Sequence, residues 1–148
     1  MKKMITILGP TACGKTSLAA ALAADIHAEI ISGDSRQVYR GMDIGTGKDL
    51  ADYRVGDINV PYHLIDIVEP GTKYNVYQYQ RDFLRAYDDI VGRGVTPVLC
   101  GGSGLYLEAV LRGYRMAPVP ENKPLRQSLE GKSLAELTEM LNDIKSRK

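Results

Sequence analysis

The sequence predicts an α/β fold in which helices cover both faces of a parallel sheet. Short apolar runs of strand length alternate along the chain with longer stretches of helical pattern, and glycine-rich loops follow several of the runs. Such an alternation favours parallel strands joined by helical crossovers, because each crossover packs on one face of the sheet. The chain has 148 residues, of which 44% are hydrophobic and 25% charged, as expected of a globular domain.

The first strand and the first helix flank a phosphate-binding loop. An apolar run at 4–8 leads into this loop, and the Ala/Leu-rich stretch 17–24 follows it. Backbone N–H groups in such loops hold a diphosphate, a lysine adds charge, and a Ser/Thr hydroxyl helps to hold Mg²⁺. We therefore predict a P-loop NTPase-like sheet with Mg²⁺ at Thr16. Taken alone, the loop indicates ATP or GTP as its ligand. The pattern G-x-x-x-x-G-K-[ST] is matched by Gly9, Pro10, Thr11, Ala12, Cys13, Gly14, Lys15 and Thr16.

The other core elements follow in order along the chain. Apolar runs bounded by turn residues predict strands at 29–32, 62–67 and 96–100. A helix is predicted at 76–91, and a shorter one at 105–111. The longer helix is indicated by apolar residues that recur at helical spacing, namely Tyr79, Phe83, Tyr87, Ile90 and Val91.

The composition changes at Ala117. Prolines at 118, 120 and 124 indicate a linker or the entry into an appended element. A capping box at 133–136 then starts a final helix. We therefore divide the chain into a catalytic core at 1–116 and a linker with the start of a helical element at 117–148. One apolar stripe on the final helix is formed by Leu134, Leu137, Leu141 and Ile144.

Three loops are expected to meet at one edge of the sheet, because ligands of parallel α/β folds gather at the carboxyl ends of the strands. These are the phosphate-binding loop, the segment 33–37 and the glycine-rich segment 101–104. Asp34 has three open roles there: it binds a metal, acts as a general base, or only forms a turn. Ser103 either caps the next helix or reaches a bound phosphate.

Three further polar residues have ordinary structural explanations. Asp66 resembles the metal-holding acid of nucleotide hydrolases, but an exposed strand residue or a helix cap explains it equally well. His27 and His63 have no companion ligands at metal spacing, which favours structural roles.

Charge and cysteine content limit the setting of the protein. A net charge of +1 gives no support for nucleic-acid binding, so such an argument depends on motifs. Cys13 and Cys100 suit free thiols in a reducing compartment, and no apolar run is long enough to span a membrane. We expect a cytoplasmic monomer.

Taken together, five segments resemble the tRNA dimethylallyltransferase family, also called tRNA isopentenyltransferases. The resemblance covers nearly the whole chain, and its most specific part is the Asp-Ser-x-Gln-x-Tyr segment followed by Met-Asp-Ile-Gly-Thr. The segments occur in the family's order at 9–16, 34–46, 63–67, 101–106 and 118–122.

The resemblance implies transfer of a dimethylallyl group from dimethylallyl diphosphate to N6 of an adenosine next to the anticodon of tRNA. It implies catalytic roles for Lys15, Asp34 and Ser103, with Asp34 as the base that takes the N6 proton. The phosphate-binding loop then holds a leaving diphosphate, and 117–148 begins an element that binds the anticodon arm. Contacts to tRNA are implied for Asp34, Ser35, Arg36, Gln37, Ser103 and Arg126.

The chain also departs from the family pattern. Gly33 and Gly47 replace small residues such as Ala, Ser103 replaces a Thr, and Tyr62 replaces the first of two histidines. Family members are about twice as long, so we expect a truncated form or the ordered part of a longer protein. Three alternatives remain open: a prenyltransferase of free adenine nucleotides, a small P-loop kinase that uses ATP, and a diphosphate-binding fragment without activity.

Overall fold

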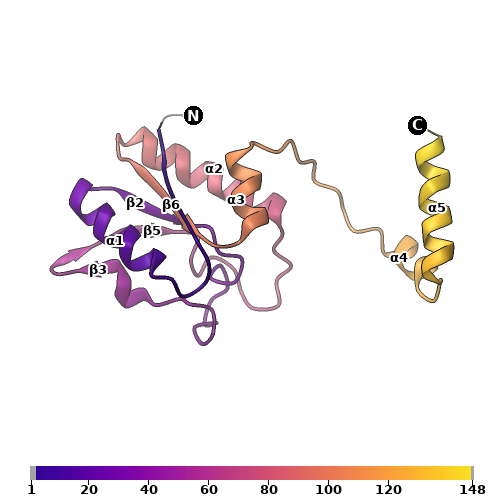
Figure 1. The fold of residues 1–148 in the computed structure, drawn as a ribbon, viewed down its shortest axis with the longest axis horizontal. Helices are drawn as coiled ribbons and strands as arrows, with labels where there is room; N and C mark the ends of the chain where they lie inside the picture. The colour runs from indigo at the N-terminus through magenta and orange to yellow at the C-terminus, as the bar shows by residue number, and fades with distance from the viewer. Residues whose placement is uncertain (1–2, 148) are drawn as a thin grey trace. The chain divides into compact units, whose positions relative to one another are not determined.

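The computed structural model describes residues 3–147, which form two compact units. The first unit comprises Met1–Met116 and the second Ala117–Lys148. Figure 1 shows the sheet and its helices in the first unit and the helices α4 and α5 in the second. Among the described residues, none of the helices is both long and apolar enough to cross a membrane.

The first unit is built on a parallel sheet with the strand order β1-β6-β2-β5. Every pairing in this sheet is parallel, so the carboxyl ends of all its strands lie at the same edge. The strands are β1 (Ile5–Leu8), β2 (Glu29–Ser32), β5 (Tyr62–His63) and β6 (Pro97–Gly101). The helices of this unit are α1 (Lys15–Ile26), α2 (Val76–Gly92) and α3 (Gly104–Leu111).

The two faces of the sheet contribute to separate hydrophobic cores, because neighbouring residues of a strand point to opposite faces. Ile30 and Val98 belong to a core with the alanines of α1, whereas Ile31 and Leu99 belong to a core with α2 and α3. Figure 1 shows α1 on one side of the sheet and α2 and α3 on the other. The predicted parallel sheet with helices on both faces is confirmed.

The strand predicted at 62–67 is wrong beyond His63. β5 ends there, and both Leu64 and Asp66 have left-handed backbone, with φ of 63° and 55°. After the strand, the N–H groups of Asp66 and Ile67 bond the carbonyls of Gln37 and Val38. The apolar run therefore leaves the sheet to support the loop that follows β2.

One segment of the first unit was not predicted as regular structure. It contains the 3₁₀ helix η1 (Leu50–Tyr53) and a hairpin of two short strands, β3 (Arg54–Val55) and β4 (Ile58–Asn59). Asp49 caps η1 by accepting a hydrogen bond from the N–H of Ala51 at 3.1 Å. This segment packs against α1 on the face of the sheet that the first core covers.

A buried lysine fixes the loop before this segment. The side chain of Lys48 is fully buried, and its Nζ lies 2.5 Å from Asp66 Oδ1, 3.2 Å from Asp43 Oδ1 and 2.6 Å from the carbonyl of Tyr39. Burial alone lowers the pKa of Lys48, but the hydrogen bonds to Asp66 and Asp43 outweigh it and raise the pKa. Asp66 therefore has a structural partner, and a fully paired ammonium holds three separate segments together.

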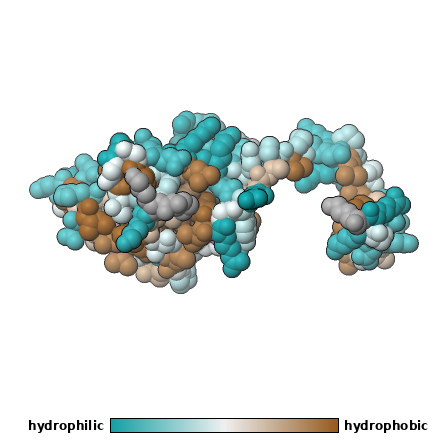
Figure 2. Space-filling view, turned by 90° about the horizontal axis from the view of Figure 1, so that it is seen from above, coloured by the Kyte–Doolittle hydropathy of each residue, from teal (hydrophilic) through white to brown (hydrophobic). Residues whose placement is uncertain are grey.

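The second unit consists of α4 (Lys123–Leu129) and α5 (Leu134–Ser146). Pro124 lies in the first turn of α4, where its missing N–H costs no helical hydrogen bond, so it does not belong to a linker. The predicted capping box is present, since Ser133 and Glu136 bond each other's backbone N–H. Leu134, Leu141 and Ile144 each stay more than half exposed, and Figure 2 shows hydrophobic residues on the surface of this unit.

Glu29 begins β2, at the edge of the sheet opposite its carboxyl ends, and hydrogen bonds link its side chain to the end of α2. Its carboxylate accepts hydrogen bonds from Arg93 Nη2 at 2.8 Å and pairs with His63 Nε2 at 2.7 Å. The bonds from Arg93 outweigh burial, with help from His63, and lower the pKa of Glu29 from the ordinary 4.5 to about 2. A carboxyl with a lowered pKa stabilises the fold above its unfolded pKa and loses this effect as the pH falls toward the folded pKa.

We therefore predict that Glu29→Gln lowers the free energy of unfolding at pH 7 by about 2 kcal/mol, since a half-buried ionic hydrogen-bond network loses its charge. The difference from the unmodified chain should shrink between about pH 4.5 and pH 2. Urea denaturation followed by circular dichroism at several pH values measures both effects. Asp88→Asn, on an exposed turn of α2, is the matched control. A difference that stays constant down to pH 2 contradicts the proposed linkage.

Two glycines let the loops after β2 and β6 approach each other. A Cβ on Gly101 would lie 2.5 Å from the carbonyl oxygen of Gly33, and a Cβ on Gly33 would lie 2.5 Å from Leu107 Cδ2. The N–H of Gly33 bonds the carbonyl of Cys100 at 2.7 Å, which continues the strand pairing into the loops. An alanine at position 33 would therefore require the side chain of Leu107 to move.

We predict that Gly101→Ala lowers the free energy of unfolding by about 3 kcal/mol, because the added methyl group meets backbone that cannot turn away. Gly104→Ala is the control: nothing lies within 4 Å of its added Cβ. As a helix residue, the alanine at 104 should leave stability unchanged or raise it by up to about 1 kcal/mol. Urea denaturation of both variants compares them, and equal stabilities contradict the close approach.

Candidate functional site

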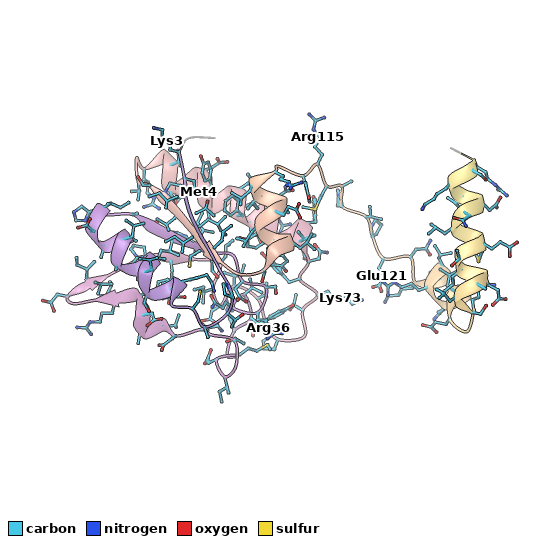
Figure 3. The ribbon with its side chains drawn as sticks, in the orientation of Figure 1. Lys3, Met4, Arg36, Lys73, Arg115 and Glu121 are labelled. Atoms are coloured by element: carbon cyan, nitrogen blue, oxygen red, sulfur yellow. The ribbon has the colours of Figure 1, made fainter. Side chains whose placement is uncertain are left out.

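A pocket of about 410 Å³ lies where the loops after β1, β2 and β6 converge. In Figure 3, Arg36 from the loop after β2 lies at the opposite end of the unit from Lys3 and Met4, which precede β1. The pocket is therefore at the carboxyl edge of the sheet. Its lining is formed by Thr11, Ala12, Cys13, Gly14, Lys15, Thr16, Asp34, Ser35, Arg36, Gln37, Gly45, Thr46, Gly47, Asp52, Tyr53, Cys100, Gly101, Gly102 and Ser103.

The phosphate-binding loop contributes the six lining residues 11–16, the last two of which begin α1. Ala12 and Gly14 both have left-handed backbone, with φ of 61° and 82°. Left-handed residues in such a loop turn successive N–H groups toward one side, and α1 adds the positive end of its dipole. Lys15 Nζ donates to the carbonyl of Pro10 and lies 3.8 Å from Cys13 Sγ. The loop thus offers an anion a set of N–H donors and one ammonium group.

Two residues at the start of this loop have a different place from the rest. Gly9 and Pro10 are outside the pocket lining. A Cβ on Gly102 would lie 3.2 Å from the carbonyl of Gly9, so this part of the loop packs against the loop after β6. Gly9 and Pro10 therefore belong to the part of the loop that faces away from the pocket lining.

Asp34 holds the turn after β2 with one of its two carboxylate oxygens. Its Oδ1 accepts hydrogen bonds from the N–H groups of Arg36 at 2.8 Å and Gln37 at 3.4 Å. Among the described residues, none donates a hydrogen bond to Oδ2. Asp34 therefore forms the turn through Oδ1. The same residue lines the pocket, and its second carboxylate oxygen has no protein donor among the described residues.

Ser103 connects the loop after β6 to the loop after β2. Its Oγ accepts a hydrogen bond from the N–H of Ser35 at 2.9 Å and lies 3.2 Å from Ser35 Oγ. It occupies the N-cap position of α3 without a side-chain capping bond. Of the two roles considered, the capping role is excluded, and the hydroxyl stays in the pocket lining beside Ser35.

The amide group of Gln37 is held at both ends. Its Oε1 accepts a hydrogen bond from Ser32 Oγ at 2.9 Å, and its Nε2 donates to the carbonyl of Gly47 at 3.1 Å. The residue is buried, so this amide is a fixed part of the wall. Ser32 in turn is anchored through its carbonyl, which accepts from the hydroxyl of Tyr79 at 3.1 Å.

Six lining residues were not recognised as site residues from the sequence. Cys100 is a free, buried thiol whose pKa is raised by burial to about 11, and its strand position gave no signal of its own. Gly45 and Thr46 belong to the Met-Asp-Ile-Gly-Thr motif that carries the resemblance, and this motif is the signal that could have indicated them. Asp52 and Tyr53 lie in the short 3₁₀ helix η1, which has no periodic signature. The unrecognised residues are Gly45, Thr46, Gly47, Asp52, Tyr53 and Cys100.

Arg126 belongs to the second unit, on α4. Its Nε lies 3.3 Å from Glu121 Oε1, and its side chain is largely exposed. Of the other predicted site residues, Gly9 and Pro10 lie outside the lining, and the remaining eleven, from Thr11 to Ser103, line the pocket. Their chemical roles remain predictions.

The donors in the pocket fit a hard divalent cation. The hydroxyl of Thr16 and the carboxylates of Asp34 and Asp52 all belong to residues of the lining, and oxygen ligands of this kind suit Mg²⁺. Within residues 3–147 there is no cluster of three acidic, histidine or cysteine side chains that would hold a metal without other ligands. This donor set therefore fits Mg²⁺ that also uses phosphate oxygens and water as ligands.

Comparisons with known proteins identify the family of the chain. A family model described as IPP transferase matches residues 37–148, and one described as isopentenyl transferase matches residues 2–56. A tRNA dimethylallyltransferase 2 of Bacteroides fragilis is 64% identical over 143 residues, which are 97% of this chain and 47% of that protein. One of Phocaeicola vulgatus is 67% identical over 139 residues, which are 94% of this chain and 45% of that protein.

Solved structures agree with these matches. The full-length tRNA isopentenylpyrophosphate transferase of Bacillus halodurans superposes with a TM-score of 0.73 and 38% identity, over 97% of this chain and 48% of that one. A eukaryotic dimethylallyltransferase acting on tRNA gives a TM-score of 0.76 with 27% identity, over all of this chain and 38% of that one. The chain spans about half the length of the curated relatives it matches. With a P-loop NTPase-like α/β fold and family-model matches across its length, the chain belongs to the IPP transferase family.

Proposed function

We propose that this chain carries the donor site and the catalytic base of a tRNA dimethylallyltransferase. The enzyme transfers a dimethylallyl group from dimethylallyl diphosphate to N6 of an adenosine next to the anticodon of tRNA. The observation that carries the proposal is the convergence of a phosphate-binding loop, the Asp34 carboxylate and the Ser103 hydroxyl on one pocket. The names of relatives that are more than 60% identical support the same activity.

In the proposed reaction the allylic C–O bond of the donor breaks and a C–N bond to N6 forms. Negative charge develops on the departing diphosphate as the bond breaks. The loop N–H groups, Lys15 and the positive end of α1 lie where this charge appears, and preorganised donors of this kind lower the barrier most. Mg²⁺, when bound beside Thr16, supplies further charge neutralisation to the diphosphate.

Asp34 accepts the proton that N6 loses. The Oδ1 atom stays bonded to the N–H groups of Arg36 and Gln37, which fixes the carboxylate plane. The Oδ2 atom is left for the acceptor amine. A base held in this way needs no rearrangement before proton transfer, which is where positioned carboxylates gain their rate advantage.

The acceptor base is seated by the loop after β2. Ser35 and Ser103 form one hydrogen-bonded pair at the pocket, and Gln37 presents a fixed amide beside it. Arg36 is exposed and offers a guanidinium to the tRNA backbone, as does Arg126 on α4. A base modified at N6 has to leave its stack to reach such a pocket.

The ATP-dependent kinase and the prenyltransferase of free nucleotides are separated by one transfer assay. Radiolabelled dimethylallyl diphosphate is incubated with unmodified tRNA, with AMP or with neither. The protein is the product of the complete reading frame that contains this segment. Label in tRNA alone supports the proposal, label in AMP at equal rate favours the free-nucleotide enzyme, and turnover of ATP without label transfer favours the kinase.

We predict that Asp34→Asn lowers kcat of tRNA prenylation at least about 100-fold, because a general base contributes about that factor or more. Asparagine keeps an Oδ1 acceptor for Arg36 and Gln37, so the turn should persist and the melting temperature should change little. Asp25→Asn, on an exposed position of α1, is the control and should keep full activity. Asp34→Asn with wild-type kcat would remove Asp34 from the mechanism.

A further inference from the structure

The Tyr53 side chain presents a feature that the proposed reaction has not used. Tyr53 ends η1 and lines the pocket, yet only 6% of its surface is exposed. Its ring packs in the core with Ala19, Ala20 and Ala23 of α1, and it lies at a tilt against Tyr62 with ring centroids 4.6 Å apart. The small side chains of α1 leave the room that this ring fills.

The hydroxyl of Tyr53 has no hydrogen-bond partner among residues 3–147. In the same part of the chain, every fully buried side-chain polar atom does have a partner. The Tyr53 oxygen therefore keeps contact with the open space that the residue lines, which is the pocket. A hydroxyl on a ring this deeply buried has little freedom to turn toward bulk solvent, so a ligand in the pocket is its natural partner.

The surroundings define what kind of partner this is. Burial, with the nearby Cys100 thiol and the Asp52 and Asp34 carboxylates, raises the pKa of Tyr53 well above its ordinary value. The group is thus a neutral O–H donor at physiological pH. Its ring is packed on α1, the helix that begins with Lys15 and Thr16, and both of these residues line the same pocket as Tyr53.

We infer that the Tyr53 hydroxyl donates a hydrogen bond to a diphosphate oxygen of the prenyl donor and so helps to position the leaving group. This inference rests on the proposed function. η1 and the β3–β4 hairpin then serve as a support for the site: the N–H of Val60 bonds the carbonyl of Tyr53 at 2.8 Å, and Asp49 caps the 3₁₀ turn. A neutral donor adds directionality to the leaving group without a further charge beside two carboxylates.

The test is calorimetric binding of inorganic pyrophosphate with Mg²⁺ to the chain and to Tyr53→Phe. Phenylalanine keeps the ring in the core and removes only the hydroxyl, so the melting temperature should be unchanged. The Kd for pyrophosphate should rise about tenfold, as expected for a lost hydrogen bond to a charged group. Tyr62→Phe, which alters the neighbouring ring outside the lining, should bind as the unmodified chain does.

Tyr79→Phe gives the opposite pattern and separates a structural role from a binding role. Its hydroxyl has a protein partner, the carbonyl of Ser32, so the loss should lower the melting temperature. If Tyr53→Phe instead lowers the melting temperature and leaves Kd unchanged, Tyr53 is a core residue and the inference is wrong. Unchanged pyrophosphate affinity combined with a raised KM for tRNA moves the contact to the acceptor and also overturns it.

Lys15→Ala distinguishes failure of this inference from failure of the proposed function. If Lys15→Ala weakens pyrophosphate binding and Tyr53→Phe does not, the donor site stands and only the role of Tyr53 fails. If the unmodified chain does not bind pyrophosphate, the donor site of the proposed function fails together with the inference.

Discussion

The pocket depends on the contact between the backbones of Gly33 and Gly101. β2 and β6 pair in parallel up to Ser32 and Cys100, and the N–H of Gly33 continues the ladder to the carbonyl of Cys100. A side chain on Gly101 would enter the Gly33 backbone, so the two loops can lie together only with a glycine at position 101. The carbonyl of Gly33 then accepts a hydrogen bond from the N–H of Ser103 at 3.3 Å. Asp34 and Ser103 therefore face one pocket because of a backbone constraint, with side-chain attraction as a secondary effect.

The same constraint extends to the phosphate-binding loop. Gly102 packs against the carbonyl of Gly9, which places the loops after β1 and β6 in contact. Farther out, the buried ammonium of Lys48 ties the Tyr39 carbonyl, Asp43 and Asp66 together and fixes the wall that carries Gly45, Thr46 and Gly47. A buried charge of this kind adds little net stability, but breaking it is costly, so it defines one arrangement of the loops. The glycine contact and the Lys48 network thus shape different parts of the lining of the same pocket.

The sequence predicted the parts of the fold whose signals are local. The strands at 29–32 and 96–100 and the helix from 76 were foreseen, because burial on both faces and helical periodicity are written into short windows. The strand at 62–67 was overextended, since Asp66 has left-handed backbone and its partner Lys48 lies 18 positions earlier in the chain, outside any local window. η1 and its hairpin were missed because two-residue strands have no readable period. The site also depended on local signals. The three loops that contain motifs were predicted to form it, whereas Asp52 and Tyr53, which lie in no motif, were not.

The lining of the pocket contains carboxylates although its proposed ligand is an anion. An anionic leaving group has to bind within a lining that already holds the carboxylates of Asp34 and Asp52. In the proposed reaction, Asp34 is neutralised by the N6 proton while the diphosphate gains charge, so the total negative charge of the pocket does not rise through the step. Lys15 and the N–H groups of the loop stabilise the negative charge that the diphosphate already has before the bond breaks. A neutral donor such as the Tyr53 hydroxyl suits this balance, because a second cation at the same position would hold Asp34 in its charged form and weaken it as a base.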